Sequence, residues 1–86
     1  MWRVFVPKSV LDRVARLPAR DADRLWAALD GMEHDPLTGD IRKLGGVEYR
    51  RRVGAYRIRF ALDFTARRVD VVRIERRTST TYSKRG

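Results

Sequence analysis

The sequence predicts an α+β domain in which two helices pack on one face of a mainly antiparallel sheet. Two observations support this class. Apolar residues between Ser9 and His34 recur at intervals of three and four, which is typical of amphipathic helices. Apolar residues between Tyr56 and Phe64 instead alternate with other residues, which is typical of a strand with one buried face. The expected order is an N-terminal strand, a two-helix hairpin and a three-stranded antiparallel meander, or βααβββ.

The N-terminal half contains the first strand and the helical hairpin. Alternation predicts a short strand from Trp2 to Pro7, where proline ends it. Two helical stripes follow, and Pro18 separates them, so we expect helices over residues 9–17 and about 20–34. The apolar positions of the two stripes are Val10, Leu11, Val14 and Leu17, and then Ala22, Leu25, Trp26, Leu29 and Met32.

The C-terminal half contains the meander. We expect residues 39–46 to form a glycine-rich loop and residues 47–53, 56–64 and 69–74 to form strands. Gly54 and Ala55 make a tight turn, and residues 65–68 make a second one. In the strand from Tyr56 to Phe64 the apolar side chains share one face, so the helices should pack there. The polar segment 78–86 is expected to be a mobile tail of a single domain that spans residues 1–86.

Positive charge is concentrated in the meander. The net charge is +9, but residues 1–40 carry six basic and seven acidic side chains, whereas residues 41–86 carry fourteen and four. A surface of this sign attracts polyanions, so the expected partner is nucleic acid or an acidic protein.

The composition argues against several classes of protein. The chain has no cysteine and one histidine, so neither a disulfide framework nor a metal site is expected, and no cofactor is predicted. No apolar run approaches the roughly 18 residues of a membrane span, and the apolar stretch after Met1 ends at Pro7, too soon for a signal peptide. We therefore expect a cytoplasmic protein.

Four arginines alternate on either side of the predicted tight turn. Residues two apart on a strand point to the same side with about 7 Å between them, which is close to the phosphate repeat of a nucleic acid strand. The alternative is a solvated, charged sheet face with no ligand. The four residues are Arg50, Arg52, Arg57 and Arg59.

Three segments together resemble a known family. Residues 35–46 resemble the loop after the helical hairpin of RelE and ParE superfamily toxins of type II toxin–antitoxin systems. Residues 49–57 resemble the family's strand–turn–strand signature, in which a basic pair is followed by Gly, any residue, Tyr and Arg. Residues 74–82 resemble its last strand and tail, and the match covers nearly the whole chain. The resemblance implies the RelE-like fold and a cognate antitoxin partner.

The superfamily has two branches on one fold. One resembles ribosome-dependent messenger RNA endonucleases, and the other resembles inhibitors of DNA gyrase. The RelE-like branch is favoured because all five positions that carry cleavage in that branch hold a suitable residue here. The alternatives are a ParE-like gyrase inhibitor and a catalytically inert basic module that binds RNA or an antitoxin. The five candidate catalytic residues are Arg50, Arg52, Arg57, Arg77 and Tyr82.

The resemblance implies cleavage of messenger RNA in the ribosomal A site by attack of a 2′-hydroxyl on the adjacent phosphate. This chemistry needs no metal. Arg57 and Arg77 would stabilise the charge that develops on phosphorus, and Tyr82 would stack on a base. The expected contacts to messenger RNA and ribosomal RNA come from Arg50, Arg52, Arg59, Lys43 and Arg76.

The general base is not identified by this pattern. Arginine stays protonated at working pH, so Arg50 and Arg52 cannot accept a proton where lysines would serve in the best-known pattern. The possible bases are Glu48, Lys43, Asp40 and Tyr82, and none has a decisive position in the sequence. We therefore expect the enzyme to rely on charge stabilisation and substrate alignment more than on acid–base transfer.

Overall fold

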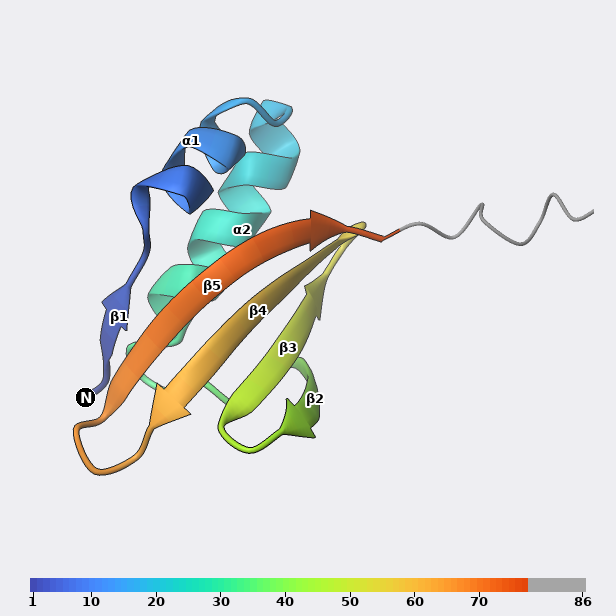
Figure 1. The fold of residues 1–86 in the computed structure, drawn as a ribbon. Coiled ribbons are helices and arrows are strands. Elements are labelled where there is room, and N and C mark those ends of the chain that lie inside the picture. Colours follow the sequence, from blue (N-terminus) through green and yellow to red (C-terminus); the bar gives the residue numbers. More distant parts are fainter. Residues whose placement is uncertain (78–86) are drawn as a thin grey trace, which may run out of the picture.

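The computed structural model describes residues 1–77, so the predicted tail and Tyr82 lie outside the described residues. Within this range no helix is long and apolar enough to cross a membrane. The elements, in chain order, are β1 (Arg3–Phe5), α1 (Lys8–Ala15), α2 (Ala19–Gly31), β2 (Asp40–Gly45), β3 (Glu48–Val53), β4 (Tyr56–Asp63) and β5 (Arg68–Arg76) (Figure 1).

The strands form one sheet in the order β1-β5-β4-β3-β2. Strands β2 to β5 pair antiparallel with their neighbours, and β1 adds to β5 as the one parallel pair among the described strands. Both helices lie on the same side of this sheet (Figure 1). The predicted α+β class, with helices packed on one face, is confirmed.

The predicted loop at residues 39–46 was wrong, because most of it is strand β2. Gly, Asp and Lys are depleted in strands, so local propensity favours a loop there. Pairing with β3 overrides that preference: Asp40 lies opposite Arg52 and Arg42 opposite Arg50, with a register shift between Lys43 and Gly45. The meander therefore has four strands instead of three.

The core lies between the helices and the inner face of the sheet. In β4 every second residue is buried, and the exposed fraction does not exceed 3% at Tyr56, Ile58, Phe60 or Leu62. Phe64, which was expected in the same row, follows the end of β4 and is 54% exposed. Burial of each large apolar side chain contributes about 1.5–3 kcal/mol. The helices contribute Val10, Val14, Leu25, Ala28 and Leu29 to this core, and Met32 adds to it directly after α2.

The turn between β3 and β4 fixes the register of the hairpin. Gly54 has φ +59° at the first position of a two-residue loop, as a type II′ turn requires. Helix α2 supports the turn from the inner side, where the Tyr56 hydroxyl donates a hydrogen bond of 3.3 Å to Asp21 Oδ2. A slip of one residue would move the four outward arginines of the hairpin to the helix side, so this turn determines which face carries them.

A β-bulge in β5 changes which residues face the helices. Arg59 pairs with Arg73 while Phe60 pairs with Val71, which leaves Val72 as an extra residue. Bulges of this kind re-aim the side chains that follow them. Because of the extra residue, Ile74 is buried and Glu75 lies on the outer face, opposite Arg57.

Candidate nucleic-acid interface

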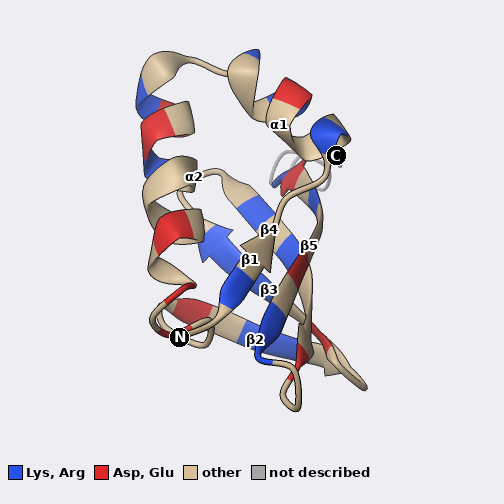
Figure 2. Cartoon of the chain, turned by 90° about the vertical axis from the view of Figure 1, so that its left-hand side faces the viewer, with Lys and Arg blue, Asp and Glu red and all other residues tan. Residues whose placement is uncertain are grey.

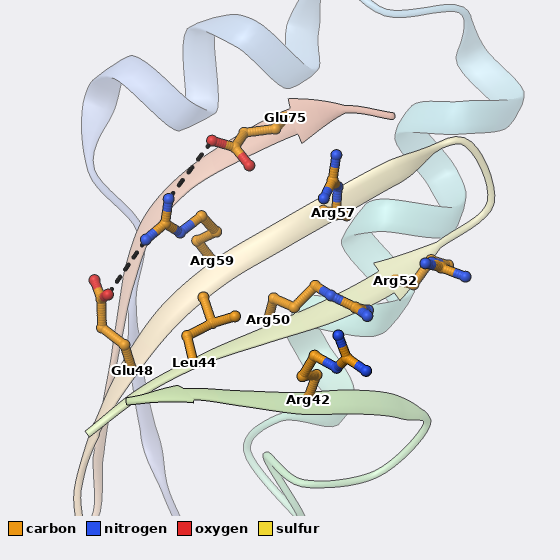
Figure 3. A pocket seen from close by; sticks show the side chains of 8 residues that line it. All are labelled: Arg42, Leu44, Glu48, Arg50, Arg52, Arg57, Arg59 and Glu75. Carbon is orange, nitrogen blue, oxygen red and sulfur yellow. Dashed lines mark hydrogen bonds and ion pairs between the residues drawn. The ribbon is translucent and has the colours of Figure 1, made fainter. Parts of the chain in front are cut away.

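No helix of residues 1–77 covers the outer face of the sheet, which contains a hollow of about 480 Å³. Basic residues outnumber acidic ones on the strands, whereas the helices carry both signs in equal number (Figure 2). The four arginines predicted from alternation all line the hollow, so they share one face as expected. The lining residues are Arg42, Leu44, Glu48, Arg50, Arg52, Arg57, Arg59 and Glu75 (Figure 3).

Cross-strand pairing arranges these side chains in rows. Neighbours within a row have Cβ atoms about 5 Å apart, and successive rows on the same face are about 7 Å apart along the strands. The row nearest the β3–β4 turn, hereafter the turn row, consists of Asp40, Arg52, Arg57 and Glu75. The next row, hereafter the arginine row, consists of Arg42, Arg50, Arg59 and Arg73.

One end of the hollow is electrically balanced. The guanidinium of Arg59 lies between two carboxylates, with Nη2 3.2 Å from Glu48 Oε1 and Nη1 3.8 Å from Glu75 Oε2 (Figure 3). The same Glu75 oxygen lies 2.9 Å from Arg73 Nε. The two carboxylates compensate the positive charge of Arg59, so this arginine should attract an anionic ligand less strongly than its position in the sequence suggests.

The other end carries positive charge with little compensation. Arg50 Nη1 and Arg52 Nε each lie 3.9 Å from an oxygen of Asp40, too far for a hydrogen bond. Within residues 1–77, Arg42 and Arg57 form no ion pair. Within residues 1–77, buried guanidinium N–H groups without a hydrogen-bond partner are found at both ends of the hollow, on Arg50 and Arg57 and on Arg59, and also on Arg51 outside it. Such groups are rare because they cost free energy.

Arg50 is at the centre of this cationic end. Its side chain is 13% exposed. Burial is the main cause that lowers its pKa, and the positive charge of Arg52 lowers it further, while Asp40 acts in the opposite direction. Arginine remains charged even so. The fold thus holds a charged guanidinium at a cost that a bound anion would offset.

Other residues predicted for the site lie elsewhere. Lys43 pairs with buried Tyr49, so its side chain is on the helix side of β2 and does not line the hollow. The guanidinium of Arg76 lies over the Tyr56 ring, 5.7 Å from its centre, also on the helix side. The backbone N–H of Arg77 donates a hydrogen bond of 2.7 Å to the Ala55 carbonyl at the turn, and this residue is not among those that line the hollow.

The sequence analysis missed two charged lining residues. Arg42 enters the site through β2, which had been predicted as a loop. Glu75 enters it through the bulge, because strict alternation from Val71 would have turned it towards the helices. The neighbouring apolar residues Val71 and Val72 were the available signal of a phase change. Within residues 1–77 no group of three or more His, Cys, Asp or Glu side chains could hold a metal ion.

Fold and site together define a small basic α+β protein with an arginine-lined hollow on the open face of its sheet. No protein-family model and no curated protein matches the sequence. The solved structures that are similar to it include three of toxins or their complexes. The RelE–RelB complex from Pyrococcus horikoshii contains a chain with 25% identity and a TM-score of 0.84, and the match covers 91% of this chain and 97% of that one.

The second structure is the RelBE2 toxin–antitoxin complex from Mycobacterium tuberculosis, with 20% identity, a TM-score of 0.75 and coverage of 88% of this chain and 98% of that one. The third is the isolated RelE toxin from E. coli, with 16% identity, a TM-score of 0.77 and coverage of 98% and 94%. The chain therefore has the fold of RelE toxins.

Proposed function

We propose that this protein is the toxin of a type II toxin–antitoxin system and acts as an endoribonuclease on messenger RNA in the ribosomal A site. The observation that carries the proposal is the cationic end of the hollow, where Arg42, Arg50, Arg52 and Arg57 converge with only distant counter-charge. Folding alone does not require such a cluster, because like charges at this spacing repel each other.

The proposed reaction is attack of an RNA 2′-hydroxyl on the adjacent phosphate, which yields a 2′,3′-cyclic phosphate and a free 5′-hydroxyl. Charge accumulates on the phosphate oxygens in the transition state. Arg50 and Arg57 line the cationic end of the hollow, and we assign to them the donation of hydrogen bonds to those oxygens. Arg52 and Arg42 would bind the flanking phosphates, which the row spacing of about 7 Å permits.

The remaining roles rest on the resemblance. Arg77 and Tyr82 occupy the positions of a catalytic arginine and a base-stacking tyrosine, and we keep both as proposed catalytic residues. Among the possible bases, Glu48 lines the hollow, whereas Lys43 lies on the helix side of the sheet. The proposal therefore uses a carboxylate as the proton acceptor.

A cognate antitoxin is the proposed protein partner. The Pyrococcus and Mycobacterium structures are complexes of a toxin with an antitoxin. An acidic antitoxin segment over the hollow would neutralise the cationic end and block access of RNA. The ribosome and its RNA would hold the messenger in one pose, which matters most for a site with weak acid–base groups. The proposed location is the cytoplasm.

An in vitro translation reaction with purified protein, read by primer extension, tests the function. We expect cuts in phase with the reading frame that depend on the ribosome. Arg57→Gln should reduce the cleavage rate about 100- to 1,000-fold, the usual effect of losing one donor to a developing oxyanion. Arg20→Gln, which removes the same charge from the exposed surface of α2, is the matched control.

Two outcomes would contradict the proposal. DNA damage after expression in cells, without messenger cleavage, would assign the protein to the gyrase-inhibiting branch. Harmless expression of the chain without any antitoxin would assign it to the inert basic modules. Growth arrest that an acidic protein encoded beside it reverses is the result expected of a toxin.

A further inference from the structure

We propose that Glu75 is the general base that removes the proton from the attacking 2′-hydroxyl. This inference rests on the proposed ribonuclease function and names the residue that the function still lacks. Arginine cannot accept the proton. The hollow is lined by only two carboxylates among the described residues, Glu48 and Glu75, so the choice lies between them.

Position in the sheet favours Glu75. It lies in the turn row directly beside Arg57, and neighbouring Cβ atoms within a row are about 5 Å apart. Glu48 pairs with Ala61, which is four residues along β4 from Arg57, or about 13 Å. In a reactive pose the 2′-oxygen is about 3–3.5 Å from phosphorus, so the base must stand close to the group that binds the phosphate.

Orientation also favours Glu75. Its ion pairs with Arg73 and Arg59 both use Oε2, at 2.9 and 3.8 Å, and no ion pair within residues 1–77 uses Oε1. Figure 3 shows one Glu75 oxygen directed at Arg59 and the other turned back towards the hollow. The Glu48 carboxylate lies beyond Arg59, away from the guanidinium groups of Arg50 and Arg57 (Figure 3).

The bulge in β5 gives Glu75 this position. Val72 is the extra residue, and without it the alternation from Val71 would turn Glu75 towards the helices. Bulges recur next to active sites because they re-aim a side chain. The two arginine contacts then hold the carboxylate in place, so one oxygen serves as the anchor and the other is available to substrate.

The proposed step is balanced without any further reactant. The 2′-hydroxyl gives its proton to Glu75 Oε1 as the bond from the 2′-oxygen to phosphorus forms. The bond from phosphorus to the 5′-oxygen breaks, and the leaving oxygen takes a proton from water. The resulting hydroxide is neutralised by the proton that Glu75 releases, which restores the carboxylate. No atom changes its oxidation state in this step.

The test measures kcat and KM for messenger cleavage on programmed ribosomes. Glu75→Gln should lower kcat about 100- to 10,000-fold, the usual contribution of a positioned base, with little change in KM. Formate or acetate added to Glu75→Ala should restore part of the rate, because a free carboxylate can enter the space and accept the proton. Asp70→Asn is the matched control, since Asp70 also lies on β5 and also pairs with the arginine two residues before it, at 3.1 Å.

Each alternative result has a definite meaning. A wild-type protein that never cleaves RNA overturns both the nuclease function and the base. An active wild type with a Glu75→Gln variant of similar rate overturns only the base and leaves the function intact. A rate that Glu48→Gln abolishes and Glu75→Gln spares assigns the role to Glu48. Loss of rate in Glu75→Ala with no rescue by formate, in a variant that still folds, overturns proton transfer by Glu75.

Discussion

The two faces of the same strands have opposite physical character. On the helix side of β4, Ile58 and Phe60 are fully buried, whereas on the outer side Arg57 and Arg59 line an open hollow. Alternation places these residues only one position apart in the chain. The free energy of folding therefore comes from one face, and the other face is free to carry charges that repel each other. The stability of this small sheet and the charge on its outer face are therefore separable.

The largest effect is expected on the helix side. Phe60→Ala should lower the free energy of unfolding by about 3–5 kcal/mol, because it removes buried apolar surface and leaves a cavity. Small domains have only about 5–15 kcal/mol in total. Urea denaturation measures the change. Val72→Ala is the control on the same sheet, since Val72 is 43% exposed at the bulge and should change the value by less than about 0.5 kcal/mol.

If the Val72 variant lost as much stability as the Phe60 variant, the outer face would contribute to folding as the inner one does. The comparison between the faces would then fail.

The next effect has opposite signs for stability and binding. Arg50→Met should weaken RNA binding by about 1.5–3 kcal/mol, the value of hydrogen bonds to a charged group. It should raise the free energy of unfolding by about 1 kcal/mol, because it removes a buried charge that has no hydrogen-bonded counter-ion. Burial and neighbouring arginines lower the pKa of Arg50, so the charged form is disfavoured in the folded protein.

The lowered pKa of Arg50 determines how its contribution to the free energy of unfolding changes with pH. A basic group with a lowered pKa binds its proton less tightly in the folded state, so stability rises as pH passes up through the folded pKa. For an arginine this window is strongly alkaline, because the group stays protonated at any working pH. Urea denaturation should therefore show the same increase in the free energy of unfolding for Arg50→Met at pH 6 and at pH 9. A gain present at only one of these values would show that another group titrates with Arg50.

The predictable parts of this molecule are those with unbroken local periodicity. Strand β4 alternates without interruption, so its sequence alone predicted both the buried row and the outward direction of Arg57 and Arg59. The turn at Gly54 was equally local. These features needed no knowledge of the partner strands.

The unpredicted parts depend on pairing between strands. Residues Asp40–Gly45 have poor strand propensity and become β2 only because β3 offers them a partner. Glu75 reaches the outer face only because β5 has one residue more than β4 in the paired region. Both features depend on register, which local patterns do not encode, and both contribute charged residues to the hollow.

A smaller effect should distinguish two neighbours on β2. Arg42 lines the hollow and Lys43 lies on the helix side, although both carry one positive charge. Arg42→Gln should weaken binding of a single-stranded RNA by about 1 kcal/mol and reduce the slope of log affinity against log salt by about 0.7, the value for one lost phosphate contact. Lys43→Gln should leave the slope unchanged. Titrations at three salt concentrations measure both, and equal slopes for the two variants would show that RNA contacts both sides of β2.

The smallest effect is expected outside both faces. Arg67 has φ +53° in the turn between β4 and β5, which is the left-handed region that favours glycine. Arg67→Gly should raise the free energy of unfolding by about 0.5 kcal/mol, because relief of strain exceeds the added entropy of the unfolded chain. Ala66→Gly at the adjacent position, where φ is not positive, should instead lower it by about 0.4–1 kcal/mol. Both variants should cleave RNA at the wild-type rate, and a change in rate would show that this turn communicates with the hollow.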